Sequence, residues 1–176
     1  MPSSTLSTYN GSWSAETRAV PALAFIEQYA RTVDSLNLTA AFSDWYAPSS
    51  VFYNSDGVIY RGGDEIWTWM KSLFGPFSAL HHDVERIRAF DEEVIFKDAK
   101  ISATRIILET KTAFTVNGLP GGSPIVVPRL LQFLVGASDE EGQGTDGLQI
   151  LEANVWWDSG SLQKQIRVRK ESKDAS

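Results

Sequence analysis

The chain has 176 residues, of which 43% are hydrophobic, and this length fits one domain with its own core. The formal net charge of −6 argues against a nucleic-acid partner, because binding phosphates requires a basic surface. The chain has no cysteine, which excludes disulfides, thiolate nucleophiles and cysteine metal sites. We expect a cytoplasmic protein with no membrane partner, since the first residues lack the features of a secretory signal and no apolar run approaches transmembrane length.

The first third of the chain predicts an arm followed by helices. Residues 1–15 are rich in serine and threonine and show no hydrophobic period, so we predict a flexible N-terminal arm. Apolar residues at spacings of three and four then predict a helix over about 18–36. Asn37 can cap a second, short helix, which Pro48 ends.

A β-hairpin and a third helix come next. β-prone runs at 51–54 and 58–60 flank a Ser-Asp-Gly turn, which is a good hairpin signal. A Gly-Pro pair ends the helix that follows. The apolar face of this helix comprises Ile66, Met70, Leu73, Phe74 and Phe77.

Strands dominate the rest of the chain. Long β-prone runs predict four strands, over about 80–90, 101–116, 126–135 and 148–157. Helices segregated from antiparallel strands favour an α+β fold. We therefore predict a cone-shaped, strongly curved antiparallel sheet, capped by three N-terminal helices, with a ligand cavity at its mouth. This single domain spans 16–168, and the basic residues near the end belong to a flexible tail at 169–176.

Three stretches carry a resemblance to a known family. They are the hairpin-to-helix passage VFYNSDGVIYRGGDEIWTWMKSLF, the strand LHHDVERI and the closing EANVWWDSGSLQKQI. Together with the first helix, over about 18–168, they resemble the nuclear transport factor 2-like superfamily, specifically its SnoaL-like branch, and more distantly scytalone dehydratase and ketosteroid isomerase. The superfamily includes isomerases, cyclases, dehydratases and proteins that only bind, so the resemblance implies the fold and leaves the chemistry open.

The two histidines are the first candidates for acid–base chemistry, because the unperturbed pKa of imidazole lies near neutrality. His81 and His82 are adjacent on a predicted strand, so their side chains should point to opposite faces and cannot share a metal. His82 has the same parity as Leu80 and Val84, and it matches a histidine of the family. We predict His82 as the catalytic acid or base; the alternative is a structural histidine bonded to backbone.

Three further residues are weighed against positions of the family. Tyr53 matches a pocket tyrosine of the dehydratase and could polarise a carbonyl, or it could simply pack in the hairpin. Asp158 falls on the family's aromatic–Asp position and could orient an imidazole, or it could cap the next turn. Asp34 lies where the dehydratase has a Tyr-Asp pair, but Val33 replaces that tyrosine, so the role is not carried over.

Arg129 interrupts an otherwise apolar strand. A buried arginine normally requires an anion or a carboxylate partner. It could therefore bind an enolate, carboxylate or phenolate of a ligand, or form an internal salt bridge to Glu109 or Glu152.

Ligand contacts are expected from aromatic and polar side chains around the cavity. Six tryptophans are many for this length, and some should select flat, apolar ligands. The predicted substrate-binding residues are Trp45, Trp67, Met70, Glu109, Asn154 and Trp156. The segment 142–147 fits G-x-G-x-x-G but leads into a strand rather than a helix, so we reject it as a dinucleotide site. We expect no cofactor and no metal.

The resulting hypothesis is a cofactor-free isomerase, cyclase or dehydratase in secondary metabolism, with His82, Tyr53, Asp158 and Arg129 as catalytic residues. Its polyketide- or terpenoid-like substrate, a small apolar or aromatic molecule, is implied by the resemblance. The alternative is a non-catalytic binding or scaffold protein of the same fold. We also predict a homodimer, on the premise that the alternating residues Leu151, Ala153, Val155 and Trp157 form an apolar outer face.

Overall fold

The computed structural model describes residues 6–119, 124–138, 140 and 142–174. The helices of this part of the chain are α1 (Ala15–Arg18), α2 (Pro21–Asp34), the 3-10 helix η1 (Phe42–Asp44), α3 (Gly63–Phe74) and α4 (Ser159–Asp174). Its strands are β1 (Ser7–Asn10), β2 (Tyr46–Tyr53), β3 (Ile59–Arg61), β4 (Phe77–Phe96), β5 (Ala99–Val116), β6 (Ile125–Ala137) and β7 (Leu148–Trp157).

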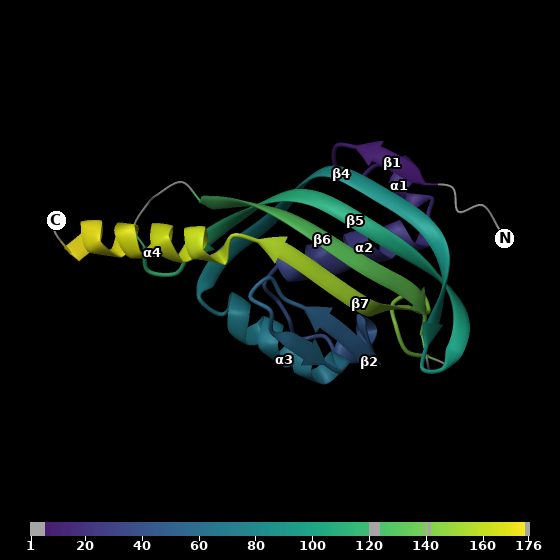
Figure 1. Cartoon of the computed structure of the whole chain (residues 1–176). Helices are drawn as coiled ribbons and strands as arrows, with labels where there is room; N and C mark the ends of the chain where they lie inside the picture. Colours follow the sequence, from purple (N-terminus) through teal and green to yellow (C-terminus); the bar gives the residue numbers. More distant parts are fainter. Residues whose placement is uncertain (1–5, 120–123, 139, 141, 175–176) are drawn as a thin grey trace.

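The predicted α+β fold is confirmed. The described strands form one seven-stranded sheet in the order β1-β4-β5-β6-β7-β2-β3, with antiparallel neighbours except for the parallel pair β2 and β7. Figure 1 shows β4 and β5 curving strongly, with α2 behind the sheet and α3 and β2 below it. None of the described helices is long and apolar enough to cross a membrane.

Alternation along the strands determines which side chains face the helices. On β5, Ile106, Leu108 and Phe114 are buried in the main core, and Thr110 and Thr112, which have the same parity, are buried on the same face. On α2, Phe25 and Ile26 are fully buried against this core. Each such side chain contributes roughly 1.5–3 kcal/mol of burial free energy. The concave face of the sheet, α2 and α3 therefore share one apolar core.

Both ends of the chain continue regular structure beyond the domain limits that the sequence suggests. Within the expected N-terminal arm, β1 pairs antiparallel with β4, with Ser7 opposite Ala89; residues 1–5 lie outside the described part. The expected tail is largely the end of α4, which Figure 1 shows extending beyond the end of the sheet. The second expected helix is only the short 3-10 helix η1.

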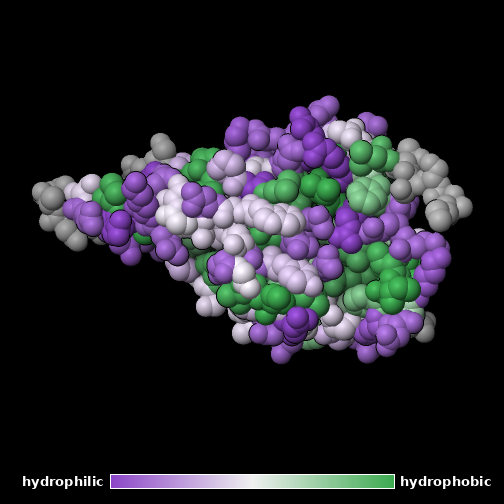
Figure 2. Space-filling model, in the orientation of Figure 1, coloured by the Kyte–Doolittle hydropathy of each residue, from purple (hydrophilic) through white to green (hydrophobic). Residues whose placement is uncertain are grey.

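The expected orientation of β7 is wrong. Ala153 and Val155 are buried in the main core, because they lie opposite Phe133 and Leu131 of β6 on the concave side. Leu151 is also buried, at a register shift where the pairing changes, in a second small cluster with Leu134. On the outer face of β6 and β7, the exposed apolar residues are instead Val126, Leu130 and Trp156. Figure 2 shows hydrophobic and hydrophilic residues mixed over this side of the molecule.

The start of α3 requires a glycine, because the backbone there lies against β2. A Cβ at Gly63 would lie 2.6 Å from the Phe42 ring and 2.9 Å from the carbonyl oxygen of Ala47. We expect Gly63→Ala to lower the free energy of unfolding by about 1–3 kcal/mol in urea denaturation. Gly75→Ala, at the other end of α3, should change it by less than about 1 kcal/mol, because its nearest contacts there are 3.5 Å away. An equal loss of unfolding free energy in Gly63→Ala and Gly75→Ala would contradict this packing.

Candidate functional site

A cavity lies between α2, α3 and the concave face of the sheet. The volume of the cavity is about 50 Å³, enough for a few water molecules. Most of its wall is apolar, including Ile26, Val33, Phe52, Trp69, Leu73 and Phe74. The polar side chains on the wall are Tyr29, His82, Thr110, Arg129 and Asn154. Few polar groups in an apolar wall are typical of a small-molecule site.

His82 and Asp34 form a close pair at this cavity. The imidazole Nδ1 of His82 lies 2.5 Å from Oδ1 of Asp34, and the backbone N–H of His82 donates to Oδ2 at 3.1 Å. Asp34 is the last residue of α2, and His82 is on the inner face of β4 with its side chain only 8% exposed. The carboxylate therefore holds both the backbone and the ring of His82.

The third member of the group is Arg129, whose Nη1 lies 3.3 Å from Nε2 of His82. A guanidinium only donates, so Nε2 must be the acceptor in this contact. The proton of the neutral ring is then on Nδ1, where it is donated to Asp34. This arrangement assigns the tautomer and leaves the lone pair of Nε2 on the ring edge away from Asp34.

The environment keeps the ring of His82 neutral. Burial lowers the pKa of His82, the hydrogen bond to Asp34 opposes this, and the charge of Arg129 lowers it further, so that the net shift is downward from about 6.5. The neighbouring His81 also lowers this pKa slightly. A neutral imidazole at pH 7 is able to accept a proton, as a general base must.

This shift makes stability dependent on pH. Below about pH 6.5 the unfolded chain protonates its histidines, while folded His82 stays neutral down to its lower pKa. The free energy of unfolding should therefore fall as the pH drops through this window, and be fully restored above it. In urea denaturation at several pH values, the free energy of unfolding should fall less on acidification for His82→Ala than for the wild type. An identical decrease in both proteins would contradict the lowered pKa.

Arg129 has neither of the salt bridges considered from the sequence. Glu109 pairs on the outer face with Arg86 and Arg88, and Glu152 pairs with Arg105. The Arg129 guanidinium instead lies over the ring of Trp157, 4.9 Å from its centroid. Burial lowers the pKa of Arg129 to about 10, so the side chain remains a cation at neutral pH.

Sequence reasoning missed a pair of buried tyrosines and set Asp34 aside. Tyr29 of α2 lines the cavity, and its hydroxyl lies 2.6 Å from that of Tyr46 and 3.4 Å from Sδ of Met70. Burial raises the pKa of both phenols, so both stay protonated. The signal was present in the helical period that places Tyr29 on the same face as Val33, close to Asp34.

Of the residues predicted as catalytic, the structure brings together only His82 and Arg129. The ring of Tyr53 is exposed, because the neighbouring Phe52 occupies the inward position on β2. Asp158 accepts a hydrogen bond from the backbone N–H of Ser161 at 2.8 Å and so caps α4. The side chain of His81 is 73% exposed, although its Nδ1 still lies 3.6 Å from Oδ2 of Asp34.

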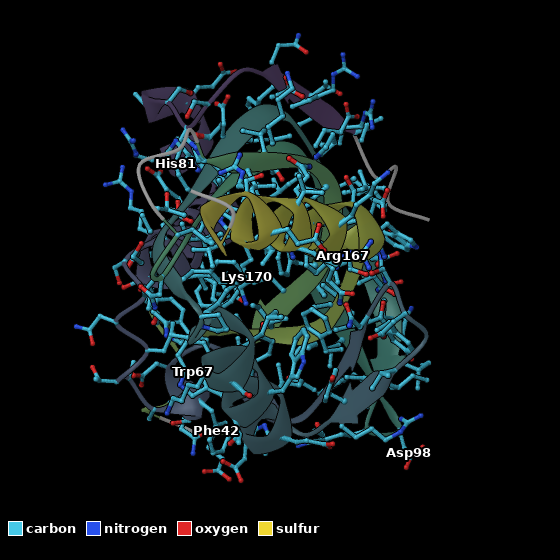
Figure 3. All side chains as sticks on the ribbon, turned by 90° about the vertical axis from the view of Figure 1, so that its left-hand side faces the viewer. Phe42, Trp67, His81, Asp98, Arg167 and Lys170 are labelled. Carbon is cyan, nitrogen blue, oxygen red and sulfur yellow. The ribbon has the colours of Figure 1, made fainter. Side chains whose placement is uncertain are left out.

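Of the six residues predicted to bind substrate, two line the cavity and four lie elsewhere. Met70 and Asn154 line the cavity. Trp45 is buried against Phe25 and Tyr29, outside the lining. Trp67 is also buried outside the lining; it donates to the carbonyl of Ala40 and is well separated from His81 in Figure 3. Glu109 lies on the outer face, as does the exposed Trp156.

No group of three or more histidine, aspartate or glutamate side chains that could hold a metal ion occurs among residues 6–119, 124–138, 140 and 142–174.

Comparisons with solved structures support the fold. A candidate SnoaL-like polyketide cyclase from Shewanella denitrificans superimposes with a TM-score of 0.55 at 12% identity, covering 82% of this chain and 96% of that one. A candidate scytalone dehydratase from Novosphingobium aromaticivorans gives 0.54 at 9% identity, covering 82% and 89%. A protein of ketosteroid isomerase-like fold from Catenulispora acidiphila, in complex with trimethylamine, gives 0.51 at 14% identity, covering 78% and 87%.

Two comparisons were made with the sequence. No functionally curated protein matches the chain. The family model of the SnoaL-like domain, however, matches residues 26–130, which is more than half of the chain and includes Asp34, His82 and Arg129. The chain belongs to the SnoaL-like domain family.

Proposed function

We propose that this protein is a cofactor-free acid–base enzyme that moves a proton on a small, largely apolar carbonyl compound. The observation that carries the proposal is the 2.5 Å contact between Asp34 and His82 at the wall of the cavity. A half-buried carboxylate that accepts from Nδ1 orients the ring and stabilises the imidazolium that forms when Nε2 takes a proton. A structural histidine would need only an acceptor for its Nδ1–H, which a backbone carbonyl can supply.

The reaction would begin with removal of a proton from the carbon next to a carbonyl by Nε2 of His82. The C–H electron pair becomes an enolate, and the proton stays on the imidazolium beside Asp34. Return of that proton to another atom gives isomerisation, and its delivery to a leaving hydroxyl gives dehydration. Attack of the enolate carbon on a second carbonyl gives cyclisation, and the imidazolium returns its proton to the alkoxide that forms. All three outcomes use the same first step.

The wall of the cavity favours flat, apolar substrates. Trp69, Phe52 and Phe74 provide aromatic surface. Together with the polyketide-cyclase and scytalone-dehydratase descriptions of the similar structures, this supports a polyketide- or terpenoid-like intermediate of secondary metabolism as substrate.

Solvent deuterium exchange tests this function even when the product has not been identified. The intermediate that accumulates when the gene is deleted should be purified and incubated with the protein in D₂O. We expect deuterium at the carbon next to its carbonyl, detected by mass spectrometry, and none with His82→Ala. Binding of the intermediate without exchange or conversion would favour the alternative, a non-catalytic binding protein.

The homodimer also remains a proposal, but its interface would be formed by other residues than those expected from the sequence. Leu130 lies opposite Trp156 on the outer face, and both are exposed, as is Val126. Burial of these three side chains against a second copy would remove apolar surface from water. Sedimentation should show twice the 19.5 kDa chain mass for the wild type and a monomer for Trp156→Glu. A wild-type monomer at micromolar concentration would contradict the proposal.

A further inference from the structure

The lone pair that the proposed base requires is already in use in the free protein. Nε2 of His82 accepts from Nη1 of Arg129 at 3.3 Å. Arg129 is a cation, and a cation beside Nε2 opposes protonation of the ring, as the direction of its effect on the pKa of His82 shows. Proton transfer to Nε2 therefore requires that this guanidinium move away or find another acceptor.

The cavity wall beside His82 has unused hydrogen-bonding capacity. Nε of Arg129 has no hydrogen-bond partner among the described residues, and neither has the hydroxyl of Thr110. Thr110 lies directly opposite Arg129 in the pairing of β5 with β6, and both residues line the cavity. Arg129 is 9% exposed and Thr110 is 2% exposed, so bulk water reaches neither freely. Buried polar groups of this kind are normally satisfied.

We infer that Arg129 and Thr110 bind an oxygen of the substrate, and that this oxygen draws the guanidinium away from Nε2 of His82, so that the substrate itself uncovers the base. The inference rests on the proposed function for the role of the base. It defines the substrate class as flat molecules with an oxygen acceptor, either a carbonyl that becomes an enolate or an existing oxyanion, next to the carbon that loses its proton.

The balance of charge supports this class. Asp34 and Arg129 contribute opposite charges around neutral His82, and the nearby Tyr29 is a neutral phenol. When the C–H bond breaks, its proton moves to Nε2 and its electron pair moves to the carbonyl oxygen. The resulting enolate faces Arg129 while the imidazolium faces Asp34, so each new charge has an opposite partner. A ligand with an ammonium group there would be repelled by Arg129.

Binding of benzoate and of its neutral analogue benzyl alcohol tests the oxygen site independently of turnover. We expect calorimetry to give saturable benzoate binding to the wild type at millimolar concentration, and binding about 10-fold weaker or more to Arg129→Met. The affinity for benzyl alcohol should differ much less between the wild type and Arg129→Met. Arg88→Met is the matched control, because Arg88 pairs with Glu109 on the outer face. It should bind benzoate like the wild type.

Nuclear magnetic resonance of the imidazole nitrogens of the wild type tests, without any variant, whether benzoate frees Nε2 of His82 from Arg129. Benzoate should raise the pKa of His82, because a carboxylate replaces the guanidinium next to Nε2. If Arg129→Met does not fold, Thr110→Val should still weaken benzoate binding. The inference is overturned if the wild type does not bind benzoate, if Arg129→Met binds it equally well, or if the pKa of His82 does not rise. Loss of the proposed function is distinguishable, because it would appear as full turnover in His82→Ala with the benzoate results intact.

Discussion

His82→Ala is expected to lower turnover by about 10²-fold or more while the protein stays folded. The substitution removes the group that accepts the proton, and leaves Asp34 with the exposed His81 as its remaining imidazole neighbour. Turnover of the accumulated intermediate and circular dichroism should be measured on the same preparation, so that loss of activity is separated from loss of structure.

His81→Ala is the matched control, because it removes the same ring from the next residue of β4. Its side chain is 73% exposed, so we expect little change in turnover. A lower melting temperature of His82→Ala with full activity per folded molecule would mean that His82 is structural. Equal loss in both variants would indicate a damaged strand rather than a missing base.

Asp34→Asn should be nearly as damaging, with a loss of about 10²- to 10⁴-fold, although the shape of the side chain is kept. An amide can donate to Nδ1, which would place the ring proton on Nε2 and remove the lone pair that accepts the substrate's proton. The hydrogen bond and charge of Asp34 also raise the pKa of His82, so the variant should titrate at lower pH. Nitrogen resonances of the imidazole would report the change of tautomer.

Asp158→Ala tests which of the two aspartates, Asp34 or Asp158, takes part in catalysis. Asp158 caps α4 through the N–H of Ser161, and loss of such a cap costs about 1 kcal/mol. We expect a modestly lower melting temperature and unchanged turnover. If Asp158→Ala abolished turnover while Asp34→Asn did not, the Asp34–His82 pair would not be the catalytic group.

The fold could be predicted because its signals are local. Periods of two and of three to four residues, together with the Ser-Asp-Gly turn, are present in the order of the residues along the chain. The strand β7 could be located in this way but not oriented. Apolar residues occupy both of its faces, and a register shift near Leu151 changes which face is inward.

The candidate site was predictable only in part, because its members come from distant segments. His82 and Arg129 stand out in their own strands, one as a titratable group and the other as a charge in an apolar run. Asp34 is 48 residues from His82, and only the packing of α2 on the sheet brings them together. The residue before Asp34, Val33, could not reveal this contact, because His82 lies across the fold.

The parallel pairing of β2 with β7 has a consequence for synthesis of the chain. Ser50 of β2 donates its hydroxyl to the carbonyl of Ile150, 100 residues later, at 2.5 Å. While β7 is still inside the ribosome, β2 has only the three-residue β3 beside it, and β6 has an open edge. Phe52, which forms part of the cavity wall, is carried by β2. The nascent protein therefore completes its binding site only after β7 has been synthesised, and chains that terminate before Leu148 would expose two strand edges to aggregation.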